Sequence, residues 1–269
     1  MDRVNSVDGA AAALIVAHPG HEIRLHGWIE RVRPLVFVLT DGSGRAGKPR
    51  LASTTRLLRR AGGRPGDIYG RFADVDLYDA VLSGEHHVFL TLAEQLAAAM
   101  FRERIRCVVA DAAEDAIMAH DVCRALVDTA VALVERHAGV DLDSFDFPII
   151  ASPRHGPHLL QADARWLTLD DTALARKLAA AHDYAEIRAE VDSALARFGV
   201  EAFRVECLRP ITDSRPGNDS GHGRPLYELH GERLVADGHY PRTIRYQEHG
   251  VPLVDALRRH GASTRSAAH

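Results

Sequence analysis

The sequence predicts an α/β fold, with a mainly parallel β-sheet, helices on both of its faces and an irregular C-terminal appendage. Two runs of consecutive apolar residues, Ala12–Ala17 and Leu35–Leu39, are typical of strands that are buried on both faces. A turn follows each run, and segments with apolar residues at helical spacing come next. Strands that alternate with helices in this way form a parallel sheet between two helical layers, so a Rossmann-like arrangement is expected.

The other elements continue this alternation along the chain. Cys107–Ala110 and Phe145–Ile150 are expected to be strands, because each is a short segment rich in apolar residues. Gly62–Gly66 is rich in glycine and is expected to be a loop between two helices. The expected helices are His21–Val32, Ala52–Ala61, Phe72–Leu82, Val88–Arg104, Ala119–His137 and Asp170–Phe198.

Composition divides the chain into three parts. Residues 1–205 are expected to form the α/β core. Prolines and glycines become frequent after it, so residues 206–260 are interpreted as a C-terminal extension that packs on the core. Residues 261–269 are expected to be a disordered tail.

Charge and cysteine content limit the function classes. The net charge of −4 argues against a nucleic-acid partner, because a broad nucleic-acid surface usually needs a basic excess. No apolar run is long enough to span a membrane, and the first residues lack the pattern of a signal peptide. The 3 cysteines are too few for a disulfide framework. A cytoplasmic protein with a small-molecule substrate is expected, and the composition leaves a homo-oligomer open.

Three histidines follow predicted strands, at the edge of the sheet where parallel strands end and ligands bind. His18 and His21 lie at the turn after the first strand, and His120 lies at the start of a helix after a later strand. Three protein ligands with one open position are typical of catalytic zinc. The alternative for each histidine is an ordinary hydrogen-bonded role at the surface.

The first of these motifs resembles a known family. Ala17-His18-Pro19-Gly20-His21-Glu22 resembles the Ala-His-Pro-Asp-Asp-Glu signature of the PIG-L/LmbE-like N-acetylglucosaminyl deacetylases. Val38–Gly44 is similar to the second strand and Thr-Asp-Gly turn of that family, and Val108–Arg124 is similar to the segment with its last metal histidine. The resemblance extends from Ala12 to Phe203.

This resemblance implies a metal-dependent hydrolase of carbon–nitrogen amide bonds, which removes an acyl group from a sugar-like molecule. His18, His21 and His120 would bind zinc or another divalent metal, with His21 in the position of an aspartate ligand. The implied substrate is an N-acylated amino sugar or glycoconjugate.

Gly20 is the main departure from the family pattern. It occupies the position of the aspartate that serves as general base, and loss of such a base typically costs about a hundred- to ten-thousand-fold in rate. Asp41 is the first candidate to move protons instead, and Asp121 and Asp111 are weaker candidates, of which Asp121 is included with Asp41 in the expected catalytic set. The alternatives are that Asp41 forms a tight turn with the next residue, and that Asp121 caps its helix or orients a ligand.

Two functions therefore stay open. One is a deacetylase that has relocated its base, and the other is a catalytically degenerate family member that binds a metal or a sugar-like ligand. A nucleotide-binding module is disfavoured, because the first strand is not followed by a Gly-x-Gly-x-x-Gly turn that would bind a pyrophosphate.

Overall fold

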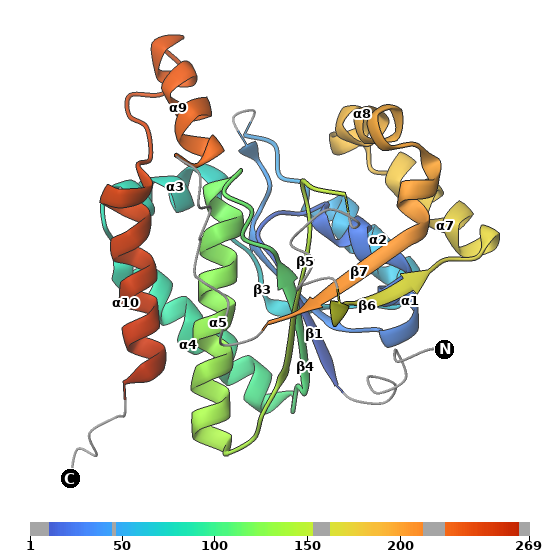
Figure 1. The fold of residues 1–269 in the computed structure, drawn as a ribbon, viewed down its shortest axis with the longest axis horizontal. Coiled ribbons are helices and arrows are strands. Elements are labelled where there is room, and N and C mark those ends of the chain that lie inside the picture. Colours follow the sequence, from blue (N-terminus) through green and yellow to red (C-terminus); the bar gives the residue numbers. More distant parts are fainter. Residues whose placement is uncertain (1–10, 45–46, 153–161, 212–223, 264–269) are drawn as a thin grey trace.

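A seven-stranded sheet lies between two layers of helices in the computed structural model, which describes residues 11–44, 47–152, 162–211 and 224–263 (Figure 1). The strand order is β3-β2-β1-β4-β5-β7-β6. Neighbours among β1 to β5 pair in parallel, whereas β7 is antiparallel to β5 and β6. The strands are β1 (Ala12–Val16), β2 (Leu35–Thr40), β3 (Arg64–Phe72), β4 (Cys107–Asp111), β5 (Asp143–Phe147), β6 (Arg165–Thr168) and β7 (Val205–Pro210).

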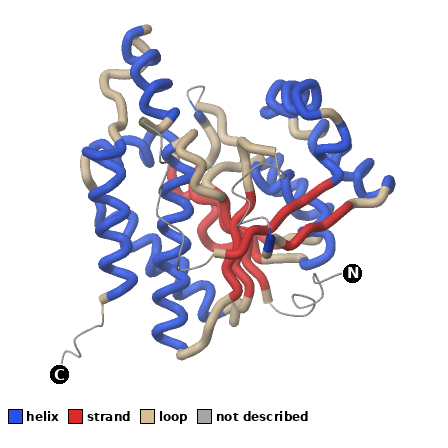
Figure 2. Tube along the Cα trace, viewed as in Figure 1, coloured by secondary structure: helices blue, strands red, loops and turns tan. Residues whose placement is uncertain are grey.

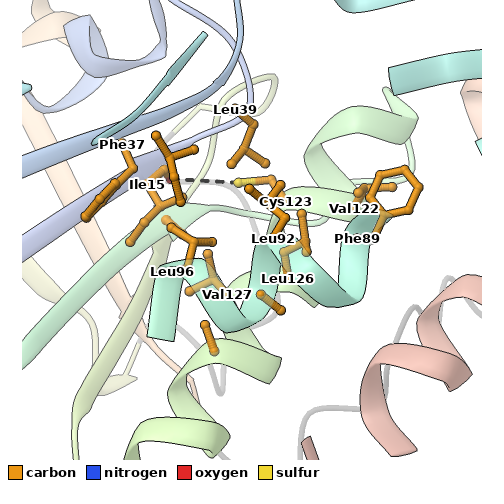
Figure 3. Packing of buried hydrophobic residues seen from close by; sticks show 14 of the residues in the cluster. Ile15, Phe37, Leu39, Phe89, Leu92, Leu96, Val122, Cys123, Leu126 and Val127 are labelled. Atoms are coloured by element: carbon orange, nitrogen blue, oxygen red, sulfur yellow. Dashed lines mark hydrogen bonds between the residues drawn. The ribbon is translucent and has the colours of Figure 1, made fainter. Parts of the chain in front are cut away.

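The helices cover both faces of the sheet, which confirms the predicted fold class (Figure 2). Apolar side chains of one face, such as Ile15 and Phe37, pack with those of α4 and α5 in one core (Figure 3). Leu14 and Val36 point to the opposite face and belong to a second core with α1 and α2. The helices are α1 (His26–Val32), α2 (Leu51–Ala61), α3 (Asp74–Leu82), α4 (His86–Arg102), α5 (Met118–Ala138), α7 (Asp171–His182), α8 (Arg188–Phe198), α9 (Leu226–Ala236) and α10 (Val251–Ala262).

The sequence analysis did not predict β3, at one edge of the sheet. Its first residues belong to the glycine-rich segment that was expected to be a loop. Pro65 cannot donate a hydrogen bond to a neighbouring strand, and an edge position tolerates this loss. The pairing of β3 with β2 also shifts register twice, so the strand has no regular alternation of buried residues.

The C-terminal region contains more regular structure than expected. The boundary placed at residue 206 falls inside β7, which pairs with β5 and β6, so this part of the extension belongs to the sheet. Helices α9 and α10 follow, and α10 buries Leu253, Leu257 and Gly261 along one face. Gly261 lies against Thr129 of α5, which fixes α10 to the core. Of the expected disordered tail, residues 261–262 are helical and 264–269 lie outside the described residues. None of the helices in the described part of the chain is long and apolar enough to cross a lipid bilayer.

A buried ion pair anchors the segment that follows β1. Lys177 Nζ donates to Glu206 Oε1 at 2.9 Å and to the carbonyl of Arg24 at 2.8 Å. The same carboxylate accepts the backbone N–H groups of Gly27 and Trp28 at the start of α1. A side chain at residue 27 would meet Leu169 Cδ2 at 2.3 Å, so only glycine allows this close approach.

Removal of Lys177 is expected to destabilise the protein strongly. Lys177→Met leaves the buried carboxylate of Glu206 without its counter-charge, which typically costs about 3–5 kcal/mol of the free energy of unfolding. Arg176→Met removes an exposed partner of Glu30 from the next position of the same helix, and a small effect is expected. Urea denaturation of both variants measures the difference, and equal losses of stability would contradict the anchoring role.

Candidate metal centre

The turn after β1 brings two histidines to the edge of the sheet. Gly20 has φ of 110°, a conformation that residues with a side chain rarely adopt, and it leads into the short 3₁₀ helix His21–Leu25. The buried carboxylate of Glu22 accepts the N–H of Gly20 at 2.7 Å, which holds the turn in place. Burial raises the pKa of Glu22 above its ordinary value. The turn at Gly20 and its hydrogen bond to Glu22 therefore determine where the side chains of His18 and His21 lie at the end of β1.

His18 is oriented by two polar side chains. Its Nδ1 lies 2.8 Å from Thr40 Oγ1 and 3.0 Å from Asp74 Oδ1. Burial acts to raise the pKa of Asp74, but the hydrogen bond and charge of His18, with further hydrogen bonds, outweigh it and lower this pKa to about 2. The carboxylate is therefore ionised and accepts the Nδ1 proton of His18.

Asp74 was missed by the sequence analysis. It begins α3, directly after the unexpected strand β3, and its other oxygen accepts the N–H of Gly44. An aspartate in the first turn of a helix ordinarily indicates a favourable interaction with the helix dipole. The sequence therefore offered no signal for a contact with His18.

Asp111 orients the second histidine. Its Oδ2 accepts the backbone N–H of Ala17 at 2.8 Å and lies 2.8 Å from His21 Nδ1. The side chain of Asp111 is fully buried, whereas 14% of the His21 side chain is exposed. Burial acts to raise the pKa of Asp111, but the charge and hydrogen bond of His21 hold it below its ordinary value. Asp111 therefore places a negative charge in the interior, beside the turn after β1 that carries His18 and His21.

His120 lies in the first turn of α5 and is almost completely buried, with an exposed fraction of 1%. Neither of its ring nitrogens has a hydrogen-bond partner among the described residues. Burial lowers the pKa of His120 well below its ordinary value, and the positive charges of neighbouring histidines add to this effect. The ring is therefore neutral and retains a lone pair that can bind a metal.

The three expected histidines converge. The ring centroids of His21 and His120 lie 4.6 Å apart, and the ring of His18 lies 5.4 Å from His21 and 5.6 Å from His120. Single donor atoms of His21, Asp111 and His120 all lie within 4.8 Å of one another. Side chains from three separated segments thus meet at the carboxyl ends of β1 and β4.

The two carboxylates expected to move protons have local structural partners. Asp41 Oδ1 accepts the N–H of Ser43 at 2.9 Å, which closes the turn after β2. Asp121 is buried, and its Oδ1 accepts the N–H groups of Glu114 and Asp115 in the loop before α5. The Asp41 contact corresponds to the turn-forming alternative, whereas Asp121 binds the loop before α5 and does not cap the helix, whose N-cap is Ile117. Asp41 is the more exposed of the two.

The donor set fits a divalent cation. His120 Nδ1, His120 Nε2 and Asp111 Oδ1 are buried and have no hydrogen-bond partner among the described residues. Buried polar atoms without partners are costly, and a cation would satisfy Asp111 Oδ1 and the one ring nitrogen of His120 that carries a lone pair. Imidazole and carboxylate are both ordinary zinc ligands.

Comparison with known proteins supports the fold. No family model matches the chain, and no curated protein matches it. A triple mutant of a deacetylase of the teicoplanin biosynthetic pathway is structurally similar, with a TM-score of 0.55 and 13% identity over 77% of this chain and 100% of that one. The deacetylase of the antimicrobial A40926 pseudoaglycone gives a TM-score of 0.50 and 15% identity over 78% of this chain and 100% of that one. The chain has the α/β fold of these deacetylases.

Zinc is expected to stabilise the folded protein. A cation that binds only the folded state at about a hundred times its dissociation constant adds about 2.7 kcal/mol of stability. We expect zinc to raise the melting temperature of the wild type and of His87→Ala, which changes an exposed histidine of α4. The increase should be absent in His21→Ala and His120→Ala, each compared with its own zinc-free melting curve. The same increase in His120→Ala would contradict a metal centre at this position.

Proposed function

We propose that the protein is a metal-dependent hydrolase of carbon–nitrogen amide bonds, with zinc as the metal and an N-acylated amino sugar or glycoconjugate as the substrate. The observation that carries this proposal is the buried, unpaired imidazole of His120 beside His21 and Asp111. The family resemblance of the His18–Glu22 motif and the deacetylase fold support the reaction class.

The proposed metal position is bordered by His18, His21 and His120. A divalent zinc ion supplies a Lewis acid that polarises an amide carbonyl and makes water more acidic. His18 and His21 are the partly exposed members, so the substrate would approach from their side. His120 closes the opposite, buried side and excludes water from it.

Asp41 is the proposed proton-transfer residue. It follows Thr40, whose hydroxyl contacts His18, and its side chain is partly exposed at the edge of the sheet. One of its oxygens accepts the Ser43 N–H, and a carboxylate has further lone pairs to offer. For Asp121, the two backbone N–H groups that it accepts favour a positioning role at the start of the His120 helix.

Gly20 favours a second candidate function, a catalytically degenerate protein that binds a metal or a sugar-like ligand. The position has no carboxylate, and its φ of 110° is a conformation that residues with a side chain rarely adopt. A Cβ atom there would lie 3.1 Å from Ile187 Cδ1. The backbone at this position thus favours glycine, where the family that the motif resembles has its base aspartate.

Hydrolysis is tested by release of acetate and free amine from N-acetylglucosaminyl substrates. We expect the zinc-loaded wild type to release both products, and a chelator or His120→Ala to abolish the release. Asp41→Asn is expected to lower kcat by about a hundred- to ten-thousand-fold, whereas Ser43→Ala should have little effect. A wild type that binds zinc and hydrolyses none of these substrates would favour the binding function.

A pair of substitutions at Gly20 distinguishes the two functions. Gly20→Ala measures the cost of any side chain at this strained position, and Gly20→Asp adds the carboxylate. In an enzyme with a relocated base, both variants should lose activity to the same extent. In a degenerate protein, Gly20→Asp should gain hydrolysis and Gly20→Ala should not. A gain of this kind would contradict the proposal that the wild type is an active hydrolase.

A further inference from the structure

We propose that Asp111, at the end of β4, is a direct ligand of the metal together with His21 and His120, and that His18 lies beside this ligand set without belonging to it. This inference rests on the proposed metal site and names the residues that hold the cation. It differs from the three-histidine set that the sequence predicts.

The first argument is the state of the Asp111 carboxylate. One oxygen, Oδ2, is used by the Ala17 N–H and His21 Nδ1, whereas Oδ1 has no hydrogen-bond partner among the described residues. The side chain is fully buried, so solvent does not satisfy this oxygen. A buried anionic oxygen without a donor is costly, and a cation at this place removes the cost.

The second argument is proximity. Asp111, His21 and His120 each offer a donor atom within 4.8 Å of the other two, and His18 is not a member of this group among the described residues. The 2.8 Å contact between His21 Nδ1 and Asp111 Oδ2 holds the imidazole and the carboxylate side by side.

The third argument is that His18 lies farther from His120 than His21 does, and that its ring is held in this position through the Nδ1 atom. It contacts both Thr40 and Asp74, and the Thr40 hydroxyl donates to the carbonyl of Ala17. His18 donates its Nδ1 proton to Asp74, and its ring centroid lies 5.6 Å from that of His120, compared with 4.6 Å for His21. These contacts hold the ring of His18 at the partly exposed side of the site, next to the proposed ligands.

The chemistry of the resulting set is self-consistent. Two histidines and one carboxylate are an established ligand set for catalytic zinc, and they leave a position open. Asp111 also supplies a carboxylate that residues 20 and 21, a glycine and a histidine, do not provide. The carboxylate of the site thus comes from β4.

Zinc affinity of four variants tests the assignment. The dissociation constant for zinc is measured on the full chain by competition with a chromophoric chelator. We expect Asp111→Asn to raise it by more than about 100-fold, beyond the roughly 10–100-fold typical of residues that only orient a ligand. Asp74→Asn is the matched control, because it changes the carboxylate that pairs with His18, and its effect should stay within that lower range.

His18→Gln gives the opposing test. We expect it to weaken zinc binding less than Asp111→Asn does, and the reverse order would overturn the proposal in favour of three histidine ligands. Circular dichroism shows whether Asp111→Asn folds. If it does not fold, the zinc dissociation constants of His18→Gln and His120→Gln are compared, and His18→Gln should bind zinc more tightly. Zinc binding by His18→Gln that is as weak as that of His120→Gln would then overturn the proposal. A wild type without stoichiometric zinc would instead remove the proposed function itself.

Discussion

The buried carboxylate of Asp111 is the constraint on which the candidate site depends. It accepts the backbone N–H of Ala17, where β1 ends, and contacts the side chain of His21 in the following turn. A charge in the interior requires donors, so the end of β4 and the turn after β1 hold one another in a fixed arrangement. Asp74 does the same for His18 from the start of α3, on the other side of the turn.

The site also joins the two cores of the protein. His120 belongs to α5, whose apolar face packs in the core that contains Ile15 and Phe37 (Figure 3). The turn with His18 and His21 leads into α1, which packs in the opposite core and is anchored by Lys177 and Glu206. The three rings therefore stay together only when both helical layers are in place on the sheet.

The sequence predicted the interior of the fold well and its edges poorly. The runs around Ile15 and Phe37 are fully apolar because these strands are covered on both faces, and this pattern is local. β3 had no such pattern, since an edge strand is covered only in part. The four-residue spacing of Leu253, Leu257 and Gly261 in α10 was a visible helical signal within a region taken to be irregular.

The same difference applies to the site. The positions of His18, His21 and His120 could be predicted because strand ends fix where a side chain leaves a parallel sheet. The contacts of Asp74 and Asp111 depend on how β3, α3 and β4 pack, which no local pattern encodes. The irregular edge strand β3 has one more consequence: its Pro65, its two register shifts and its exposed charges at Arg64, Asp67 and Arg71 disfavour extension of the sheet by another chain. At this edge the fold is thus protected against aggregation by strand addition.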